Sequence, residues 1–379
     1  TLCREWAEHL TQEGFDVEVL TTTIREFQSD WNESHYRPGV YRENGVTVRR
    51  FELRRGAHGE FNAINKRLLL GLNITREEES TFVHEGPNSE HLVGYIESHR
   101  NESHFLFIPY LFGTTYFGIK AARDRGILIP CLHDEAYARM RLFRECFSEV
   151  SAFMFNSYPE QALAEDMYKI GDARKIVLGM GMEPIPAVDP EAFRSKYSQK
   201  NPFLLYVGRK DATKNTELLI AYFQQFKKDH PHRLLDLVLI GSGEVACDDP
   251  AVRDLGFVAA QDKYNAYAAA EVFCNPSTNE SFSIVLMEAW LSRTPALVHA
   301  MSPPMRDFAE KSRGGLIFSD YYDFEACLLH LLDNKRDAED LGLNGRNFVN
   351  EHFTWPVLIS RFDKWISNTT SANAVPNED

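Results

Sequence analysis

The sequence predicts an α/β fold of two doubly wound domains, each a parallel sheet with helices on both faces. The chain of 379 residues is long for a single hydrophobic core. Short, continuous apolar runs alternate with amphipathic stretches, which is the pattern of strands buried between helices. The pattern stops at the proline-rich segment 183–190 and then begins again, so we take this segment as the linker between the domains.

The first predicted domain comprises residues 1–186. Apolar runs predict its strands at 15–21, 46–53, 104–110, 127–132, 152–156 and 175–178. Residues 1–14 have helical spacing, whereas a doubly wound domain normally opens with a strand and a ligand-facing loop. We therefore expect the native protein to carry a strand and a glycine-rich loop ahead of this sequence.

The second predicted domain comprises residues 187–352. Its strands are expected at 202–207, 235–240, 252–258, 272–275 and 296–299, with a first helix at 216–228. Residues 353–366 form an amphipathic helix that we expect to pack back toward the first domain. The polar tail 367–379 is expected to be disordered.

Composition and charge exclude several classes of protein. The formal charge of −14 argues against general nucleic-acid binding, which needs Lys and Arg to neutralise phosphates. No apolar run reaches the roughly 18 residues that a membrane-spanning helix needs. The 6 cysteines include no C-x-x-C pair and several lie in apolar patterns, which is typical of buried thiols in a reducing compartment. We therefore expect a cytoplasmic protein without a structural zinc site or a disulfide framework.

Residues 275–290 form the most informative segment of the chain. A buried strand leads through a polar turn into a helix from Ile284, with Ser283 at its N-cap. Backbone N–H groups at the start of a helix attract phosphate, and Glu280 and Glu288 place a carboxylate on either side of them. Carboxylates accept hydrogen bonds from hydroxyl groups, so a ligand with the order sugar, phosphate, nucleoside fits this segment. The alternative is a capped helix with two solvated glutamates.

A second polar segment follows the first strand of the second domain. Gly208 allows a sharp turn there. Arg209 and Lys214 would then project into the crevice beyond the strand ends, where ligands bind in open α/β sheets, and two cations can neutralise a diphosphate. The alternative is a solvated basic loop, which the presence of segment 275–290 in the same domain disfavours.

Two further motifs are less specific. His133, followed by two acidic residues, ends an apolar strand of the first domain, where it would either face the same crevice or cap the next helix. Residues 241–246 match the dinucleotide fingerprint G-x-G-x-x-A, but Pro250 interrupts the helix that the fingerprint requires. We interpret residues 241–246 as a tight turn that lines the nucleotide site.

The second domain resembles the nucleotide-binding domain of retaining glycosyltransferases of family 4, which have the GT-B architecture of two Rossmann-like domains facing each other across a cleft. The resemblance covers nearly all of residues 200–355. It rests on an ordered set of motifs, namely Gly208-Arg209, Lys214-Asn215, Gly241-Ser242-Gly243, Gly256-Phe257-Val258, Pro276-Ser277, Glu280 with Glu288, Thr294-Pro295 and Gly314-Gly315. The first domain matches more loosely, at 45–50, His133-Asp134, Asn156-Ser157 and 181–183.

The resemblance implies a role for each matching position. The nucleoside would be held at its base and its ribose, by backbone groups near Phe257 and Val258 and by the carboxylate of Glu288. The diphosphate would be held by a glycine turn, two cations and two amides, from Gly208, Arg209, Lys214, Ile284 and Val285. The donor sugar would be held by a carboxylate and three amides, from Glu280, Ser281, Phe282 and Ser283, while His133 would approach it from the first domain. Family members generally need no divalent metal, the chain has no Asp-x-Asp motif, and no cofactor is expected.

The chain departs from the family pattern at two places. Ser281 and Ser283 flank Phe282 where the family commonly has glycines, so their side chains would narrow or rewire the sugar pocket. Met180 precedes Gly181 where many members have Asn. Neither departure removes a proposed charge.

We therefore expect a metal-independent, retaining glycosyltransferase. It would move a hexose from a nucleotide-diphosphate sugar, UDP-glucose or a similar UDP-hexose, to a saccharide or lipid-linked acceptor in polysaccharide or glycoconjugate synthesis. Two alternatives stay open: a nucleotide-sugar epimerase of the same architecture, and a sugar-nucleotide-binding protein without catalysis. Residues 136–147 form a basic, apolar helical stretch that would either touch an anionic membrane surface or pack as a surface helix with extended arginines.

Overall fold

The computed structural model describes residues 2–26, 31, 33–56 and 58–372. The chain divides into two compact units, one formed by Thr1–Gly179 with Ile359–Asp379 and the other by Met180–Leu358. Both units consist of parallel sheets and helices, which confirms the predicted α/β class. The division falls at Gly179, shortly before the segment 183–190 where the sequence places it.

The first unit contains two sheets, with the strand orders β1-β3-β2 and β4-β5-β6-β7. Its strands are β1 (Glu18–Thr22), β2 (Gly39–Glu43), β3 (Val46–Phe51), β4 (Phe105–Phe107), β5 (Gly126–Leu128), β6 (Ala152–Phe155) and β7 (Arg174–Val177). Neighbouring strands are parallel except β2 and β3, which form a hairpin. Asn44 and Gly45 turn this hairpin with φ values of 49° and 85°, as an Asn-Gly turn requires.

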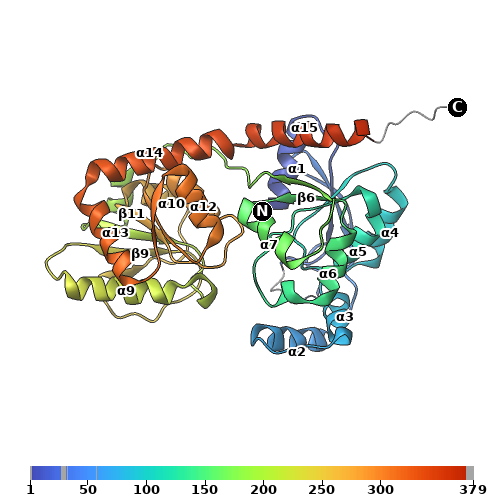
Figure 1. The fold of residues 1–379 in the computed structure, drawn as a ribbon, viewed down its shortest axis with the longest axis horizontal. Helices are drawn as coiled ribbons and strands as arrows, with labels where there is room; N and C mark the ends of the chain where they lie inside the picture. Colours follow the sequence, from blue (N-terminus) through green and yellow to red (C-terminus); the bar gives the residue numbers. More distant parts are fainter. Residues whose placement is uncertain (1, 27–30, 32, 57, 373–379) are drawn as a thin grey trace. The chain divides into compact units, whose positions relative to one another are not determined.

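Helices surround both sheets of the first unit (Figure 1). They are α1 (Leu2–Gln12), α2 (His58–Leu69), α3 (Arg76–Glu85), α4 (Glu90–His99), α5 (Gly113–Ala122), α6 (Arg141–Glu149) and α7 (Tyr158–Met167), with single turns at Arg123–Arg125 and Tyr137–Arg139. β5 is shorter than the predicted strand 127–132. It ends early because Pro130 has no N–H to donate to a ladder and Cys131 adopts a φ of 53°.

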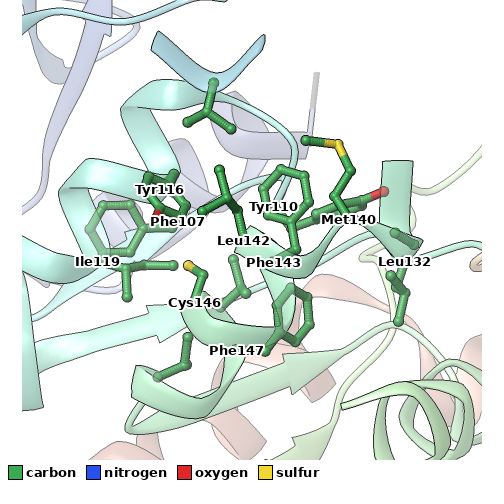
Figure 2. Close-up of a cluster of buried hydrophobic side chains, with 14 of the residues drawn as sticks. Phe107, Tyr110, Tyr116, Ile119, Leu132, Met140, Leu142, Phe143, Cys146 and Phe147 are labelled. Carbon is green, nitrogen blue, oxygen red and sulfur yellow. The ribbon is translucent and has the colours of Figure 1, made fainter. Parts of the chain in front are cut away.

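Helix α6 uses the apolar side of segment 136–147 to build the hydrophobic core of the first unit (Figure 2). Its buried side chains are Leu142, Phe143, Cys146 and Phe147. The buried carboxylate of Glu79 accepts hydrogen bonds from the N–H groups of Arg141 and Leu142, at 3.1 Å each, and so caps the helix N-terminus. The apolar face of α6 is therefore filled by protein contacts and is not available to a membrane. No helix in the described part of the chain is long and apolar enough to cross a membrane.

The second unit contains one parallel sheet of 6 strands in the order β10-β9-β8-β11-β12-β13. The strands are β8 (Phe203–Val207), β9 (Asp236–Ile240), β10 (Val252–Asp254), β11 (Val272–Asn275), β12 (Ala296–His299) and β13 (Gly315–Phe318). β10 stops short of the predicted strand 252–258 because the Asp254 carboxylate accepts a hydrogen bond from the Gly256 N–H, at 2.9 Å, and turns the chain.

Two groups of helices cover the two faces of this sheet (Figure 1). One group contains α9 (Thr216–Asp229) and α13 (Tyr321–Asp333). The other contains α8 (Pro190–Tyr197), α10 (Ala260–Ala269), α11 (Ile284–Leu291), α12 (Pro303–Ser312) and α14 (Lys335–His352). Helix α14 packs on α11 through a glycine: a Cβ atom on Gly345 would lie 2.3 Å from Cδ1 of Trp290. This close contact fixes the position of α11, the helix that follows segment 275–283.

The last helix, α15 (Trp355–Ala372), continues beyond the predicted end at 366. Residues 367–372, expected to be disordered, are therefore helical, and 373–379 lie outside the described residues. From Ile359 onward the helix belongs to the first unit. There the Arg361 guanidinium donates to the Val177 carbonyl at 2.6 Å, and the Phe362 ring packs edge-on against Trp6.

Gly345→Ala tests the contact between α14 and α11. Alanine favours a helix over glycine by about 1 kcal/mol, but its methyl group would overlap the Trp290 indole, and overpacking costs about 1–3 kcal/mol. We expect the variant to unfold at a lower denaturant concentration. Gly94→Ala in α4, where a Cβ meets no atom within 4 Å, is the control and should unfold at an equal or higher concentration. A stabilised Gly345→Ala variant would contradict the packing described.

Candidate functional site

The sheet of the second unit creates a crevice between β8 and β11. These strands are neighbours, but the chain leaves β8 toward β9 and β10, and leaves β11 toward β12 and β13. The connections therefore diverge at the carboxyl ends of β8 and β11, which is where open α/β sheets bind ligands. The loop after β8 carries Arg209 and Lys214, and the loop after β11 carries Glu280. The topology thus brings the two predicted polar segments to one place.

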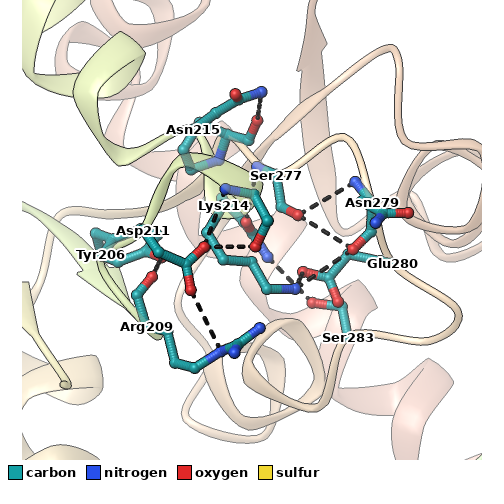
Figure 3. Close-up of polar contacts among 12 residues, drawn as sticks. Tyr206, Arg209, Asp211, Lys214, Asn215, Ser277, Asn279, Glu280 and Ser283 are labelled. Atoms are coloured by element: carbon teal, nitrogen blue, oxygen red, sulfur yellow. Dashed lines mark hydrogen bonds and ion pairs between the residues drawn. The ribbon is translucent and has the colours of Figure 1, made fainter. Parts of the chain in front are cut away.

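Lys214 and Glu280 meet across this crevice (Figure 3). The Lys214 ammonium lies 2.7 Å from Oε1 of Glu280 and also donates to the Asn279 carbonyl at 3.3 Å. Their side chains are only 20% and 13% exposed. A cation and an anion separated by many residues in the sequence are therefore paired and partly withdrawn from water, directly beyond the strand ends.

Arg209 lies apart from this pair. Its side chain is 61% exposed, and its Nε is 3.6 Å from Oδ2 of Asp211. Burial raises the pKa of Asp211, but hydrogen bonds from Thr213 and the charge of Arg209 outweigh it and lower the pKa below its usual value. Tyr206 Oη donates a hydrogen bond to the Arg209 carbonyl at 2.5 Å and so fixes the backbone of this loop. Arg209 therefore has a long, exposed side chain on a fixed backbone, in the same loop as Lys214.

The backbone N–H of Gly208 forms a hydrogen bond with the neighbouring strand β9. Its N–H donates to the Ile240 carbonyl at 2.9 Å, while its φ of 157° allows the sharp turn that the sequence predicts there. The part of Gly208 in holding a diphosphate stays a prediction. Glycine is also needed at Gly241, where a Cβ atom would be 1.9 Å from the Gly208 carbonyl oxygen. The close approach of these two loops requires a residue without a side chain.

Three polar residues to which the sequence interpretation gave no role of their own, Asn215, Asn275 and Ser277, shape the loop after β11. The Asn275 carboxamide accepts from the Ser277 N–H at 3.1 Å and donates to Ser283 Oγ at 3.1 Å, closing the loop on itself. Asn215 donates to the Pro276 carbonyl at 3.2 Å and so joins this loop to the one after β8. The sequence indicates these contacts only through the general tendency of Asn and Ser side chains to form hydrogen bonds with nearby backbone groups in turns.

The start of α11 differs from the predicted cap. Ser283 stands at the N-cap position with a φ of 84°, but its side chain makes no cap hydrogen bond, because Oγ accepts from Asn275 instead. The first N–H groups of a helix have no acceptor within the helix, so those of Ile284 and Val285 point to a region that favours an anion. Phe282 is buried against the rings of Phe308 and Phe353, so only its backbone can face a ligand.

Glu288 is not the open carboxylate that the sequence suggested. It is 6% exposed. Its Oε1 accepts from the Lys263 ammonium at 2.5 Å, and its Oε2 from Tyr267 Oη at 3.1 Å. Oε1 also accepts from Tyr264 Oη at 3.4 Å, so a ribose hydroxyl would use the second lone pair of Oε2 or displace Lys263. Lys263 could not be singled out from the sequence, since it depends on α10 packing on α11.

A cavity of about 640 Å³ opens beside the same strand ends. Its lining consists of Lys210, Gly241, Ser242, Gly243, Glu244, Asp254, Leu255, Gly256 and Phe257. Lys210 is buried and paired with Asp254, whereas the Phe257 ring is 88% exposed. Val258 follows directly and is half-buried. Phe257, one of the two residues predicted to lie near the base, thus lines a pocket with an exposed aromatic side chain.

His133 belongs to the first unit, where it follows β5. Its Nδ1 lies 3.9 Å from Oε1 of Glu135. The segment before it is fixed by Glu160, a buried residue whose carboxylate accepts from the N–H groups of Leu132 and Asn156, at 2.6 and 2.5 Å. In residues 2–26, 31, 33–56 and 58–372, no group of three or more His, Cys, Asp or Glu side chains could hold a metal ion.

Comparison with known proteins agrees with this geometry. Residues 201–334 match the family described as "Glycosyl transferases group 1". Glycogen synthase of Thermus thermophilus is 31% identical over 180 residues, which cover 44% of this chain and 38% of that enzyme. Sucrose-phosphate synthase of Thermosynechococcus elongatus has a TM-score of 0.69 at 17% identity, over 98% of this chain and 93% of its own. A trehalose-6-phosphate structure from E. coli, bound with UDP-2-fluoro glucose, has a TM-score of 0.69 at 10% identity, over 96% and 95%.

The fold is therefore the GT-B fold. Residues 201–334 of the second unit are similar to the group 1 glycosyltransferases, and the solved structures share the fold of the whole chain. The matched region of the Thermus relative spans less than two fifths of that enzyme's length. Membership of family 4 in particular stays a prediction.

Glu160 makes the first unit sensitive to pH. Burial raises the pKa of its carboxyl to about 8, against hydrogen bonds from Asn156 and Leu132 that lower it. A carboxyl with a raised folded pKa binds its proton more tightly in the folded state, so its stabilisation is complete below about pH 4.5 and is lost as the pH rises to about 8.

We expect the free energy of unfolding of the wild type to fall as the pH rises from about 4.5 to about 8. Glu160→Gln does not titrate, so this variant should lack the part of the fall that the Glu160 carboxyl causes. Urea unfolding at several pH values measures it. An identical pH dependence in variant and wild type would show that the folded and unfolded states bind the Glu160 proton equally, which would contradict the raised pKa.

Proposed function

We propose that the protein is a metal-independent, retaining glycosyltransferase that moves a hexose from a UDP-sugar to a saccharide or lipid-linked acceptor. The observation that supports this most is the Lys214–Glu280 pair at the divergence of β8 and β11. A pyrophosphate-linked sugar has phosphate oxygens that can pair with Lys214 and hydroxyl groups that can donate to Glu280. A bound donor can therefore replace each partner of the pair with a group of its own, so that neither buried charge is left unpaired.

The remaining groups of the second unit complete the proposed donor site. Arg209, on its exposed side chain, would add a second cation at the diphosphate, and the N-terminus of α11 would add backbone donors. The leaving diphosphate gains negative charge in the transition state, so donors already in place there lower the barrier. In the proposed front-face displacement, the leaving phosphate oxygen takes the proton of the acceptor hydroxyl as the new glycosidic bond forms.

Two parts of the proposal rest on the sequence resemblance. His133 in the first unit would contact the donor sugar, and Glu288 would hold the ribose after exchange with Lys263. The inferred cytoplasmic location is supported by the cysteines, which are free thiols in the described residues. Polysaccharide or glycoconjugate synthesis is the process that such a transfer would serve.

A nucleotide-sugar epimerase would use the same anion-binding and hydroxyl-binding groups. Incubation of the protein with donor alone separates the two activities. The transferase releases UDP only when an acceptor is added, whereas an epimerase changes a stereocentre of the sugar without one. A non-catalytic binding protein would bind donor and do neither.

Removal of either partner of the pair tests the proposal. We expect Lys214→Ala and Glu280→Ala each to reduce the rate of UDP release about 10²–10³-fold, since each removes a group that meets the donor in the transition state. Lys335→Ala, which removes the cation of the Lys335–Glu271 surface pair in the same unit, is the matched control and should keep the wild-type rate. Wild-type turnover in a folded Lys214→Ala or Glu280→Ala variant would refute the proposed site.

The exposed ring of Phe257 provides a separate test of nucleotide binding. Stacking of a base on an aromatic side chain contributes about 1–3 kcal/mol, so Phe257→Ala should raise the Kd for UDP about tenfold or more. Tyr322→Ala removes an aromatic ring that is 76% exposed elsewhere in the second unit and should leave the Kd unchanged. Calorimetric titration measures both, and equal affinities in the two variants would contradict base binding at this pocket.

A further inference from the structure

The cavity beside Phe257 has a fixed carboxylate in its wall. Asp254 is the last residue of β10, an edge strand of the sheet in the second unit, and it lines this cavity of about 640 Å³ together with Phe257. In the described part of the chain, both hydrogen bonds to the Asp254 carboxylate end on Oδ1, one from the Lys210 ammonium and one from the Gly256 N–H at 2.9 Å. The side chain is 29% exposed. Oδ2 is therefore the oxygen that a ligand in the cavity can reach.

Lys210 holds this carboxylate from below the cavity. Its side chain is fully buried, and its backbone is fixed because its N–H donates to the Ser242 carbonyl at 2.8 Å. A Cβ atom on Gly243 would lie 2.7 Å from the Lys210 carbonyl oxygen, so the chain packs closely here. Asp254 cannot turn Oδ1 toward a ligand without leaving a buried cation unpaired, which is strongly unfavourable.

Stability alone does not explain this ion pair. Apolar side chains of similar volume generally stabilise a buried position as well as an ion pair does, because both charges lose their hydration. What the pair provides, and apolar residues would not, is a hydrogen-bond acceptor with a fixed direction in the wall of the cavity. An ionised carboxylate oxygen accepts hydrogen bonds and cannot donate one. The cavity wall therefore favours a ligand that carries an N–H or O–H donor at this point.

Nucleobases differ in the group that would meet such an oxygen. Uracil and guanine carry a proton on the ring nitrogen of their base-pairing edge, whereas the corresponding ring nitrogen of cytosine is an unprotonated acceptor. Proteins recognise unpaired bases by hydrogen bonds to this edge and by stacking on an aromatic ring. Phe257, in the turn that follows Asp254, provides an exposed ring in the same cavity. The carboxylate would accept from uracil or guanine and would face a lone pair of cytosine.

We propose that Asp254 determines the base specificity of the donor site, selecting a base with a protonated ring nitrogen, uracil or guanine, against cytosine. Lys210 is a positioning residue that acts through Asp254. The proposal rests on the proposed function, in which this cavity takes the base of the nucleotide donor. Glu244 is a second carboxylate in the lining, but within the described residues no hydrogen bond or ion pair fixes its side chain.

Asp254→Asn reverses the hydrogen-bonding character of the atom that faces the cavity. Only the oxygen of a carboxamide can accept from the Lys210 ammonium and the Gly256 N–H, so its nitrogen takes the place of Oδ2 and presents a donor. UDP and CDP carry rings of equal size, so stacking on Phe257 does not separate them. By calorimetric titration, we expect the wild type to bind UDP about 10-fold or more tightly than CDP, and the variant to lose or invert this preference. Equal affinities in the wild type, or an unchanged preference in the variant, would overturn the proposal.

Two further variants show whether the effect belongs to Asp254. Asp249→Asn changes a carboxylate that also accepts from a nearby backbone N–H, that of Ala251 at 2.9 Å, but that lies outside the residues lining the cavity. Glu244→Gln changes the other carboxylate of the lining. Both variants should keep the preference for UDP over CDP. Loss of the preference in Glu244→Gln, with Asp254→Asn unchanged, would overturn the assignment to Asp254.

Asp254→Asn weakens the pairing of a buried ammonium and can fail to fold for that reason. Lys210→Met/Asp254→Asn then decides in the same way, because the Gly256 N–H still orients the carboxamide.

Nucleotide binding separates this inference from the proposed transfer reaction. Selective binding that depends on Asp254 supports the inference even if no sugar is transferred, whereas UDP-sugar turnover without any dependence of base preference on Asp254 overturns the inference alone. If the wild type binds GDP more tightly than UDP and loses its preference over CDP in Asp254→Asn, the role of Asp254 is supported and the uridine of the proposed donor is wrong. Failure to bind UDP, GDP and CDP would overturn both.

Discussion

The divergence of the chain at β8 and β11 is the constraint on which the rest of the second unit depends. Two parallel strands lie side by side, but their following loops lead in opposite directions, so neither loop covers the carboxyl ends. The space between them is filled by side chains, and the Lys214–Glu280 ion pair is the interaction that spans it. The Asn215 and Asn275 side chains fix the backbone on both sides of that pair.

A partly buried ion pair contributes little to folding, because the loss of hydration offsets much of the attraction. The role of the pair at this position is to interact with a ligand rather than to stabilise the fold. Each partner is oriented and largely withdrawn from water, and each can exchange the other for a complementary group of a ligand. The same reasoning applies to Glu288, whose bonds to Lys263 and Tyr267 keep a buried carboxylate satisfied. A glycosyltransferase that handles a highly charged donor needs such groups in place before the donor arrives.

The core strands and the pairing of the two polar segments could be predicted from the sequence. Runs such as 203–207 and 237–240 are continuously apolar because both faces of the sheet are covered, and the carboxyl ends of parallel strands share one edge. The environment of Glu288 could not be predicted, since it depends on how α10 packs against α11. The same holds for segment 136–147, whose sequence fits a lipid surface as well as the protein core that α6 in fact joins. Ser283 stands at the predicted N-cap position but makes no cap hydrogen bond, because Asn275, 8 residues earlier, binds the hydroxyl that would have capped the helix.

The measurement that tests the account most directly is a crystal structure of the protein with a non-transferable UDP-sugar. We predict that the diphosphate lies at Lys214 and the N-terminus of α11, that a sugar hydroxyl has replaced Lys214 at the Glu280 carboxylate, and that the Lys214–Glu280 hydrogen bond is broken. A bound UDP-sugar that leaves this pair intact, or that lies away from the β8 and β11 strand ends, would contradict the central claim.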